Sequence, residues 1–224
     1  MMKLRSMSGQ RAPNIEADTK LAQEIKSLLA RGEREAAGKR FEALVERHQR
    51  RATRIAYYYL RNTSETDEVV QDAFLKTFLH LPSFREELLF ELWFTRIVVN
   101  TCLDRLKARA RRNRWLVPIS DSNYAIAEQH QTSTPSPEAS LLMHERHARL
   151  SAAIAHLPDR QRTVVILNQF EGYSIREVGT MLKLQDPTVR VHLFRAIRTL
   201  RKRLRRERWL IDNRTLCKSK ARQG

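Results

Sequence analysis

Residues 67–112 read DEVVQDAFLKTFLHLPSFREELLFELWFTRIVVNTCLDRLKARARR, and they change from acidic to basic along their length. Val70, Phe74, Phe78 and Leu81 recur at helical spacing, which predicts an amphipathic helix that Pro82 ends. A second helix is predicted over residues 88–112, with aromatic residues near its start and arginines near its end. Two helices joined by a turn are therefore the expected centre of an N-terminal helical domain.

The rest of the chain continues the helical pattern. Glycine (6) and proline (7) are scarce in the 224 residues, and few segments alternate with period two. A helix is expected to begin near Lys20, a longer one to span residues 34–60, and Ser64 or Thr66 to cap the next. After a polar stretch, helices are expected over 137–156, after Asp159, after the capping box at 174–177, and from 186 to 206.

These expectations give an all-α fold with two small helical domains joined by a flexible linker. The predicted domains are a disordered extension (1–19), an N-terminal domain (20–114), a linker (115–138), a C-terminal domain (139–206) and a basic tail (207–224). The linker is assigned because it is polar and lacks periodic apolar residues.

The composition restricts the classes of partner. A formal net charge of +17 favours a polyanion, either nucleic acid or an anionic membrane surface. No apolar run approaches the ~20 residues that span a bilayer, and residues 1–20 lack the apolar core of a secretory signal. The two cysteines, Cys102 and Cys217, lie far apart, which indicates a reduced cytosolic compartment.

The sign change within residues 67–112 suggests two partners for one segment. Acidic residues repel nucleic acid, so the acidic helix indicates a basic protein partner. Aromatic residues beside a basic helix suit unstacked bases and phosphates. Simpler interpretations remain open: the acidic residues form a solvated face, Phe90 and Trp93 belong to the core, and Asn100 is a buried amide.

Residues 174–204 indicate a helix-turn-helix. Ser174 and Glu177 form a capping box, and a tight turn at 183–185 leads to a second helix. Gln185 or Asp186 is expected to cap that helix, with Pro187 in its first turn. Its outer face is expected to enter a DNA major groove, and a plain helical hairpin with a solvated basic face is the alternative.

The two segments, in this order, resemble a group IV, or extracytoplasmic-function (ECF), sigma factor of bacterial RNA polymerase, in the sigma-70 family. The first match runs through DEVVQDAFLKTF and an aromatic, arginine, asparagine and DRL pattern that is similar to sigma region 2. The second contains LPDRQR, EGYSIRE, TVR and RAIRTLR, which look like region 4. Together the two segments cover about two-thirds of the chain.

The resemblance implies a role for each segment. It implies docking on the β′ clamp helices of core RNA polymerase through Asp67, Glu68, Val70, Gln71, Asp72 and Phe74. Recognition and opening of the −10 promoter element is implied for Phe84, Arg85, Phe90, Trp93, Asn100, Asp104 and Arg105, with a flipped base against the loop at 85–90. Recognition of the −35 element is implied for Gln185, Thr188, Arg190, His192, Arg195 and Arg198.

The resemblance also implies further partners: the polymerase β flap, promoter DNA and an anti-sigma factor, with the linker directed toward the active-site and RNA-exit side. The sequence departs from the family pattern at Leu88 and Leu89, where small polar residues are usual. Lys183 replaces a customary glycine in the helix-turn-helix, and Pro187 replaces a small residue.

No catalytic arrangement is recognisable, so the chain is not expected to be an enzyme or to need a cofactor. His144, His147 and His156 have no cysteine nearby, and no metal site is expected there. Two alternatives are a stand-alone helix-turn-helix regulator, which leaves the acidic helix unexplained, and a basic RNA-binding protein, which leaves the capping box unexplained.

Overall fold

The computed structural model describes the backbone of residues 15–85, 88–115 and 149–220, and the side chains of residues 16–85, 88–112 and 149–205. Within these ranges the chain is helical apart from short connections, and no strand is present. The all-α prediction is therefore confirmed. No helix in this part of the chain is both long and apolar enough to cross a membrane.

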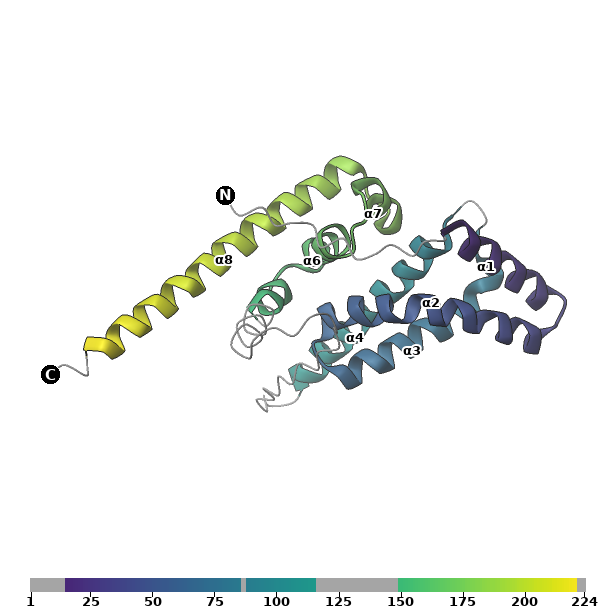
Figure 1. The fold of residues 1–224 in the computed structure, drawn as a ribbon, viewed down its shortest axis with the longest axis horizontal. Helices are drawn as coiled ribbons and strands as arrows, with labels where there is room; N and C mark the ends of the chain where they lie inside the picture. The colour runs from purple at the N-terminus through teal and green to yellow at the C-terminus, as the bar shows by residue number, and fades with distance from the viewer. Residues whose placement is uncertain (1–14, 86–87, 116–148, 221–224) are drawn as a thin grey trace, which may run out of the picture.

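The N-terminal unit consists of four helices and a short 3-10 turn. They are α1 (Ile15–Ala30), α2 (Arg34–Leu60), α3 (Thr63–His80), η1 (Leu81–Ser83) and α4 (Phe90–Trp115). Helix α2 packs against α1, α3 and α4, and α3 also packs against α4 (Figure 1). The core between them contains Leu44, Ile55, Val69, Phe94 and Val98, all almost fully buried. Burial of these apolar faces is the main stabilising contribution to the unit.

Two details of the N-terminal unit differ from the sequence predictions. Helix α1 begins at Ile15, so the expected start near Lys20 and the disordered extension to residue 19 are wrong for residues 15–19. Asp18 is buried there, and its carboxylate accepts a hydrogen bond from Arg47 (2.6 Å) and forms a second one with His48 Nε2 (2.9 Å). Both partners lie far away in the chain, so no local sequence pattern reveals them. The cap of α3 is Asn62, whose side chain accepts from the Glu65 N–H, rather than Ser64 or Thr66.

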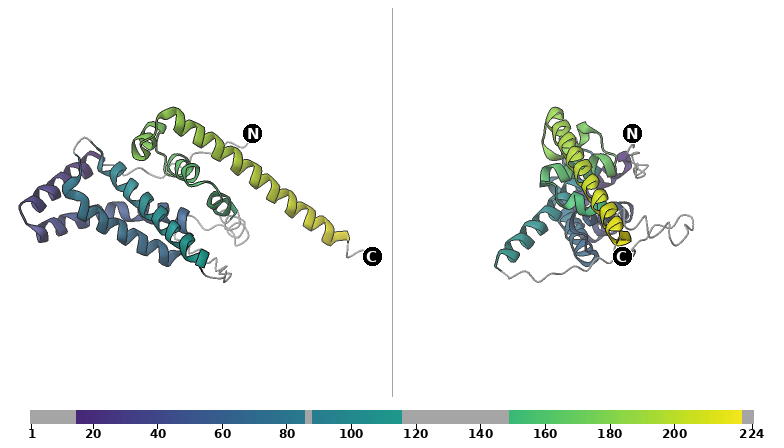
Figure 2. Two further views of the ribbon diagram at one scale, coloured as in Figure 1. Left: turned by 180° about the vertical axis from the view of Figure 1, so that it is seen from behind. Right: turned by 90° about the vertical axis from the view of Figure 1, so that its left-hand side faces the viewer.

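The C-terminal unit is built around α8. Residues 149–155 are helical and are followed by α6 (Asp159–Val165), a π-helical turn η2 (Ile166–Phe170), α7 (Ile175–Leu182) and α8 (Asp186–Lys220). Helix α8 packs on α6 and α7 and continues beyond the expected end at residue 206 (Figures 1 and 2). At 1.5 Å per residue its 35 residues span about 52 Å. Part of the predicted tail, 207–220, is therefore helical.

One buried carboxylate joins the two units. The Glu171 side chain is fully buried and accepts hydrogen bonds from Arg54 Nε (2.8 Å) and Nη2 (2.7 Å) and from Arg51 Nε (3.1 Å). Arg51 also donates to the Glu171 backbone carbonyl (3.0 Å) and to Glu91, and lies 4.6 Å from the Tyr173 ring centroid. A buried carboxylate without a partner is strongly destabilising. Glu171 can therefore stay buried only while Arg51 and Arg54 remain packed against it.

Neutral contacts extend the interface on both sides of Glu171. Tyr59 donates its hydroxyl to Thr163 (2.8 Å), and the hydroxyls of Thr95 and Tyr173 are 2.8 Å apart. All four residues are buried, and burial raises the pKa of both tyrosines. Helix α7 also packs against α4. The two units are thus held by a buried, hydrogen-bonded contact in this structure.

The buried His48 predicts a pH-dependent stability. Burial lowers the pKa of His48 from its ordinary value of 6.5, although the Asp18 carboxylate opposes this shift. A depressed histidine pKa means that the unfolded chain binds the proton more readily, so stability present above pH 6.5 is lost as the pH falls below it. We expect the free energy of unfolding, measured in urea between pH 7.5 and 5, to fall more steeply for the wild type than for His48→Gln.

His80→Gln is the control, because His80 is exposed at the end of α3. Its pH dependence should match that of the wild type. Parallel curves for the wild type and His48→Gln would show that His48 does not titrate with folding.

Candidate functional site

The exposed face of α3 contains most of the residues expected to dock on polymerase. Asp67, Glu68, Gln71 and Asp72 are exposed, because they lie opposite the apolar stripe that α3 buries against α2 and α4. Val70 and Phe74 were also predicted for docking, but they are only 6% and 8% exposed and face the core. Their side chains hold α3 against the core.

Two leucines that the sequence did not single out complete this face. Leu75 and Leu79 are 59% and 63% exposed, and they lie one helical turn apart on α3. They share the face with Gln71 and Asp72, so an apolar centre lies beside carboxylates. The sequence does indicate their exposure, because both leucines fall outside the helical stripe of Val70, Phe74 and Phe78. We call Asp67, Glu68, Gln71, Asp72, Leu75 and Leu79 the α3 face.

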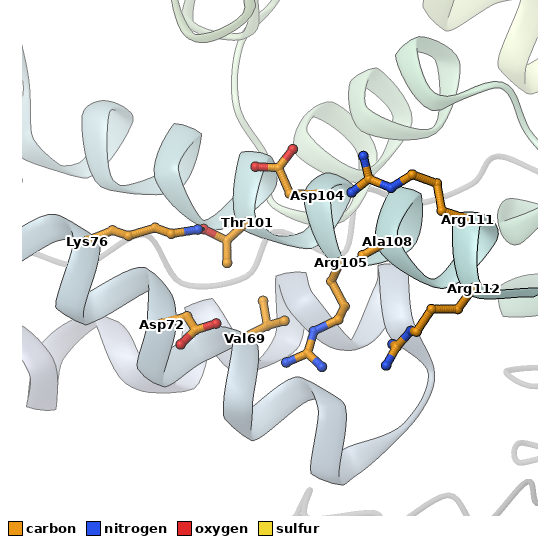
Figure 3. A pocket seen from close by; sticks show the side chains of 9 residues that line it. All are labelled: Val69, Asp72, Lys76, Thr101, Asp104, Arg105, Ala108, Arg111 and Arg112. Atoms are coloured by element: carbon orange, nitrogen blue, oxygen red, sulfur yellow. The ribbon is translucent and has the colours of Figure 1, made fainter.

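An open groove separates α3 from α4 and brings together residues expected to bind different partners (Figure 3). Val69 and Asp72 line it from α3, and Asp104 and Arg105 from α4. Arg105 crosses the groove and donates to Glu68 (2.6 Å). The remaining lining residues are Lys76, Thr101, Ala108, Arg111 and Arg112. The predicted docking and −10 sets are therefore contiguous on the surface and linked by an ion pair.

The aromatic residues near the start of α4 form part of the core. Phe84 and Phe90 are fully buried, and the centroid of the Phe84 ring lies 5.0 Å from that of Trp93 and 6.1 Å from that of Phe90. Helix α1 holds this segment, because Lys26 donates to the Phe84 carbonyl (2.9 Å) and Thr19 accepts from the Phe90 N–H (3.1 Å). Neither phenylalanine has a face open to a base in this structure.

The loop at 85–90 lies only partly in the described chain, because residues 86 and 87 fall outside it. Leu88 and Leu89, the departures from the family pattern, are half-buried and pack against the core. They thus act here as apolar supports for the start of α4. Trp93 is half-buried as well, so part of its ring remains accessible.

The polar residues predicted for the −10 element are accessible. Asn100 and Asp104 are exposed one turn apart on α4, Arg85 is exposed, and Arg105 is partly exposed. The interpretation of Asn100 as a buried amide is wrong. Its amide is free to donate and accept at the surface, which is what reading a base edge requires.

The helix-turn-helix forms as predicted. Ser174 caps α7 by accepting from the Glu177 N–H (3.2 Å), and Glu177 accepts from the Ser174 N–H (2.8 Å). Lys183 adopts the left-handed conformation (φ 53°) in which glycine is usual, so the turn is kept despite the substitution. Helix α8 then begins at Asp186, with Gln185 in the capping position and Pro187 in the first turn.

Gly179 allows α7 and the turn to come close together. A Cβ at this position would lie 2.7 Å from the Leu184 carbonyl oxygen, and the Leu184 N–H donates to the Gly179 carbonyl (2.9 Å). The carbonyl belongs to the backbone of the turn, so it cannot move without shifting α8. Gly179 therefore fixes the position of the second helix.

The outer face of α8 presents the residues predicted to contact the −35 element. Gln185, Thr188, Arg190, Arg195 and Arg198 are exposed, and His192 is partly exposed. The opposite side of α8 packs inward through Val189, Ala196 and Leu200, each at most 8% exposed. Val191 (46%) and Phe194 (66%) are also exposed on the outer side, although neither was among the residues predicted to contact DNA.

Comparison with known proteins agrees with both halves of this arrangement. Residues 44–112 match the family "Sigma-70 region 2" and residues 147–200 match "Sigma-70, region 4", together more than half of the chain. The RNA polymerase sigma-H factor of Pseudomonas aeruginosa is 30% identical over 183 residues, which is 81% of this chain and 93% of that protein. A second relative, the ECF RNA polymerase sigma factor SigM of Mycobacterium tuberculosis, is 33% identical over 156 residues, 70% of this chain and 72% of its own. The chain belongs to the ECF sigma factors.

Solved structures share the fold of this ECF sigma factor. The structure of CnrH in complex with the cytosolic domain of CnrY has a TM-score of 0.59 at 23% identity and covers 84% of this chain and 97% of its own. The sigma factor RpoE of Bartonella quintana, in complex with the anti-sigma factor NepR, has a TM-score of 0.57 at 17% identity and covers 75% and 98%.

Two glycine substitutions test the packing of this sigma factor's helix-turn-helix. We expect Gly179→Ala to lower the free energy of unfolding by about 1–3 kcal/mol, because the added methyl overpacks a backbone contact. Gly38→Ala should instead raise it by about 0.5–1 kcal/mol, because a Cβ there meets nothing within 4 Å and alanine favours a helix. Urea unfolding followed by circular dichroism measures both. Equal effects of the same sign would contradict the close approach at Gly179.

Proposed function

We propose that this chain is a promoter-specificity subunit: it binds core RNA polymerase and directs initiation at promoters that have −35 and −10 elements. The observation that supports this most strongly is the presence, on one chain and in family order, of regions 2 and 4 with oppositely charged exposed faces. The chain contributes no catalytic chemistry of its own, since the polymerase makes the RNA. It acts in the cytoplasm, where polymerase and promoter DNA are.

The α3 face is our proposed docking surface for the β′ clamp helices. Its carboxylates match a basic partner surface and orient the encounter, while Leu75 and Leu79 supply apolar area at the centre. Exposed apolar residues grouped on one face are a common feature of protein interfaces. Arg105 limits the negative charge of this face by pairing with Glu68.

Residues 20–114 form the proposed unit for docking and for the −10 element. Asn100 and Arg105 on α4 are suited to a base edge and a phosphate, and Trp93 offers a partly accessible ring. Phe84 and Phe90 support this surface from the core, and a direct contact with DNA would require the aromatic cluster to open. Residues 139–206 form the proposed −35 unit, which acts through the outer face of α8. The linker, 115–138, lies almost wholly outside the described residues.

Further protein partners follow from the same proposal. The β flap of polymerase is the expected contact for the C-terminal unit. An anti-sigma factor is a second expected partner, because both solved structures described above are complexes, one of them with an anti-sigma factor.

Charge reversal tests the docking surface. We expect Asp67→Lys, Glu68→Lys and Asp72→Lys together to raise the Kd for core polymerase at least tenfold, because three favourable charges become repulsive. Fluorescence anisotropy with labelled chain measures the Kd. The matched control reverses Glu35, Glu42 and Glu46, which are exposed on α2, with the same change in net charge. Equal weakening by both triple variants would mean that overall charge, rather than the α3 face, governs binding.

Run-off transcription tests the function itself. Core polymerase with the purified chain, acting on fragmented genomic DNA, should start transcripts downstream of a shared two-part sequence. Arg195→Ala should reduce initiation at those promoters about tenfold, since one good base contact contributes about 1–3 kcal/mol. Arg50→Ala, an exposed arginine on α2, should leave initiation unchanged. Transcripts with no shared upstream sequence would refute the proposed function.

A further inference from the structure

Two large apolar side chains lie exposed on the outer side of α8, the side opposite Val189, Ala196 and Leu200. Phe194 is 66% exposed and Val191 46%, and they are adjacent on the helix because they are three residues apart. In the described part of the chain, the other large hydrophobic residues exposed to this degree are Leu75 and Leu79 on the α3 face. Exposed apolar side chains that are grouped on one face, rather than scattered singly, are typical of binding surfaces.

Phe194 and Val191 are not required to pack α8. The helix is anchored by Val189, Ala196 and Leu200 on its opposite side, all nearly buried. Truncating either exposed side chain should therefore leave the C-terminal unit folded. This separates a role in binding from a role in stability.

Basic residues surround the apolar pair and define the partner. Arg190, Arg195 and Arg198 are exposed on the same part of α8, and Asp186 is the only acidic residue between positions 186 and 205. A surface of this charge favours a polyanion over an apolar protein surface. The occupant that supplies phosphates and a small apolar group together is duplex DNA. In its major groove, thymine exposes a C5 methyl group that no other unmodified base has.

We propose that Phe194, with Val191 beside it, contacts a thymine methyl in the DNA element that α8 binds, and so selects thymine at one or two positions. This inference rests on the proposed function, since it requires α8 to lie in the major groove. The pair would add an apolar contact to a face on which the other residues predicted to contact DNA are polar or charged. Arginines there can recognise guanine edges or phosphates, whereas the pair would distinguish thymine from cytosine and from uracil.

Replacing thymine with uracil tests the proposal because it removes only the methyl group. Binding sites are first selected from random duplex DNA with holoenzyme assembled from core polymerase and the full chain. Each thymine of the upstream element is then replaced singly by deoxyuridine, and holoenzyme affinity is measured by competition. We expect one or two positions at which the replacement weakens binding about three- to fivefold, the effect of losing the burial of one methyl-sized group.

Variants of the chain complete a double-mutant cycle. Phe194→Ala should bind the thymine and uracil sites equally, and Phe194→Leu should retain part of the discrimination. Val191→Ala should reduce it less than Phe194→Ala. Thr199→Ala, an exposed residue farther along α8, should leave it unchanged.

The outcomes separate this inference from the proposed function. If holoenzyme selects no common sequence, the proposed function fails. If it selects one, but every uracil replacement is silent or its effect persists in both Phe194→Ala and Val191→Ala, the methyl contact is wrong and the function stands. If Phe194→Ala weakens binding to core polymerase or abolishes self-association instead, the apolar pair belongs to a protein interface, which also overturns the inference.

Discussion

The buried carboxylate of Glu171 is the interaction on which the arrangement of this sigma factor depends. It lies in the C-terminal unit, but its charge is balanced by Arg51 and Arg54 of α2, and Arg51 also balances Glu91 of α4. Glu171 is neutralised by two arginines of the other unit, and one of them, Arg51, also neutralises Glu91 of its own unit. Separating the units would break the pairs of Glu171 with both arginines at once, so the contact is both specific and cooperative. The hydrogen bond of Arg54 to Glu171 also raises the pKa of Arg54.

The contact leaves the proposed functional surfaces uncovered. It uses the face of α2 that carries Arg51, Arg54 and Tyr59, and the first turns of α4. The α3 face and the outer face of α8 stay exposed. The same helices thus have separate tasks on opposite sides: α3 buries Val70 and Phe74 and exposes carboxylates with Leu75 and Leu79. Helix α8 buries Val189 and Leu200 and exposes arginines with Phe194. In both helices, the buried apolar stripe accounts for packing against the core. The exposed apolar residues do not contribute to that packing, and they indicate a binding surface.

Much of the fold could be predicted because its signals are local. The bounds of α2, Arg34–Leu60, and the capping box at Ser174 follow from periodicity, Gly32 and short-range hydrogen bonds. What the sequence could not show depends on residues far apart in the chain. Asp18 extends α1 because His48, 30 positions away, satisfies its carboxylate. Glu171 is buried because Arg54, 117 positions away, meets it. For the same reason Phe84 and Phe90 could be placed near α4 by sequence but could not be assigned to core or surface.

A distance measurement between the two units tests the role of Glu171 most directly. Spin labels at Gln71→Cys on α3 and Thr180→Cys on α7 report the separation in a Cys217→Ser background, where Cys102 is protected because burial raises its pKa to about 12. We expect one narrow distance distribution for this chain and for Glu68→Gln, which removes an exposed ion pair with Arg105. For Glu171→Gln we expect a broad distribution at longer distances. Equal distributions in all three chains would contradict the claim that Glu171 holds the units together.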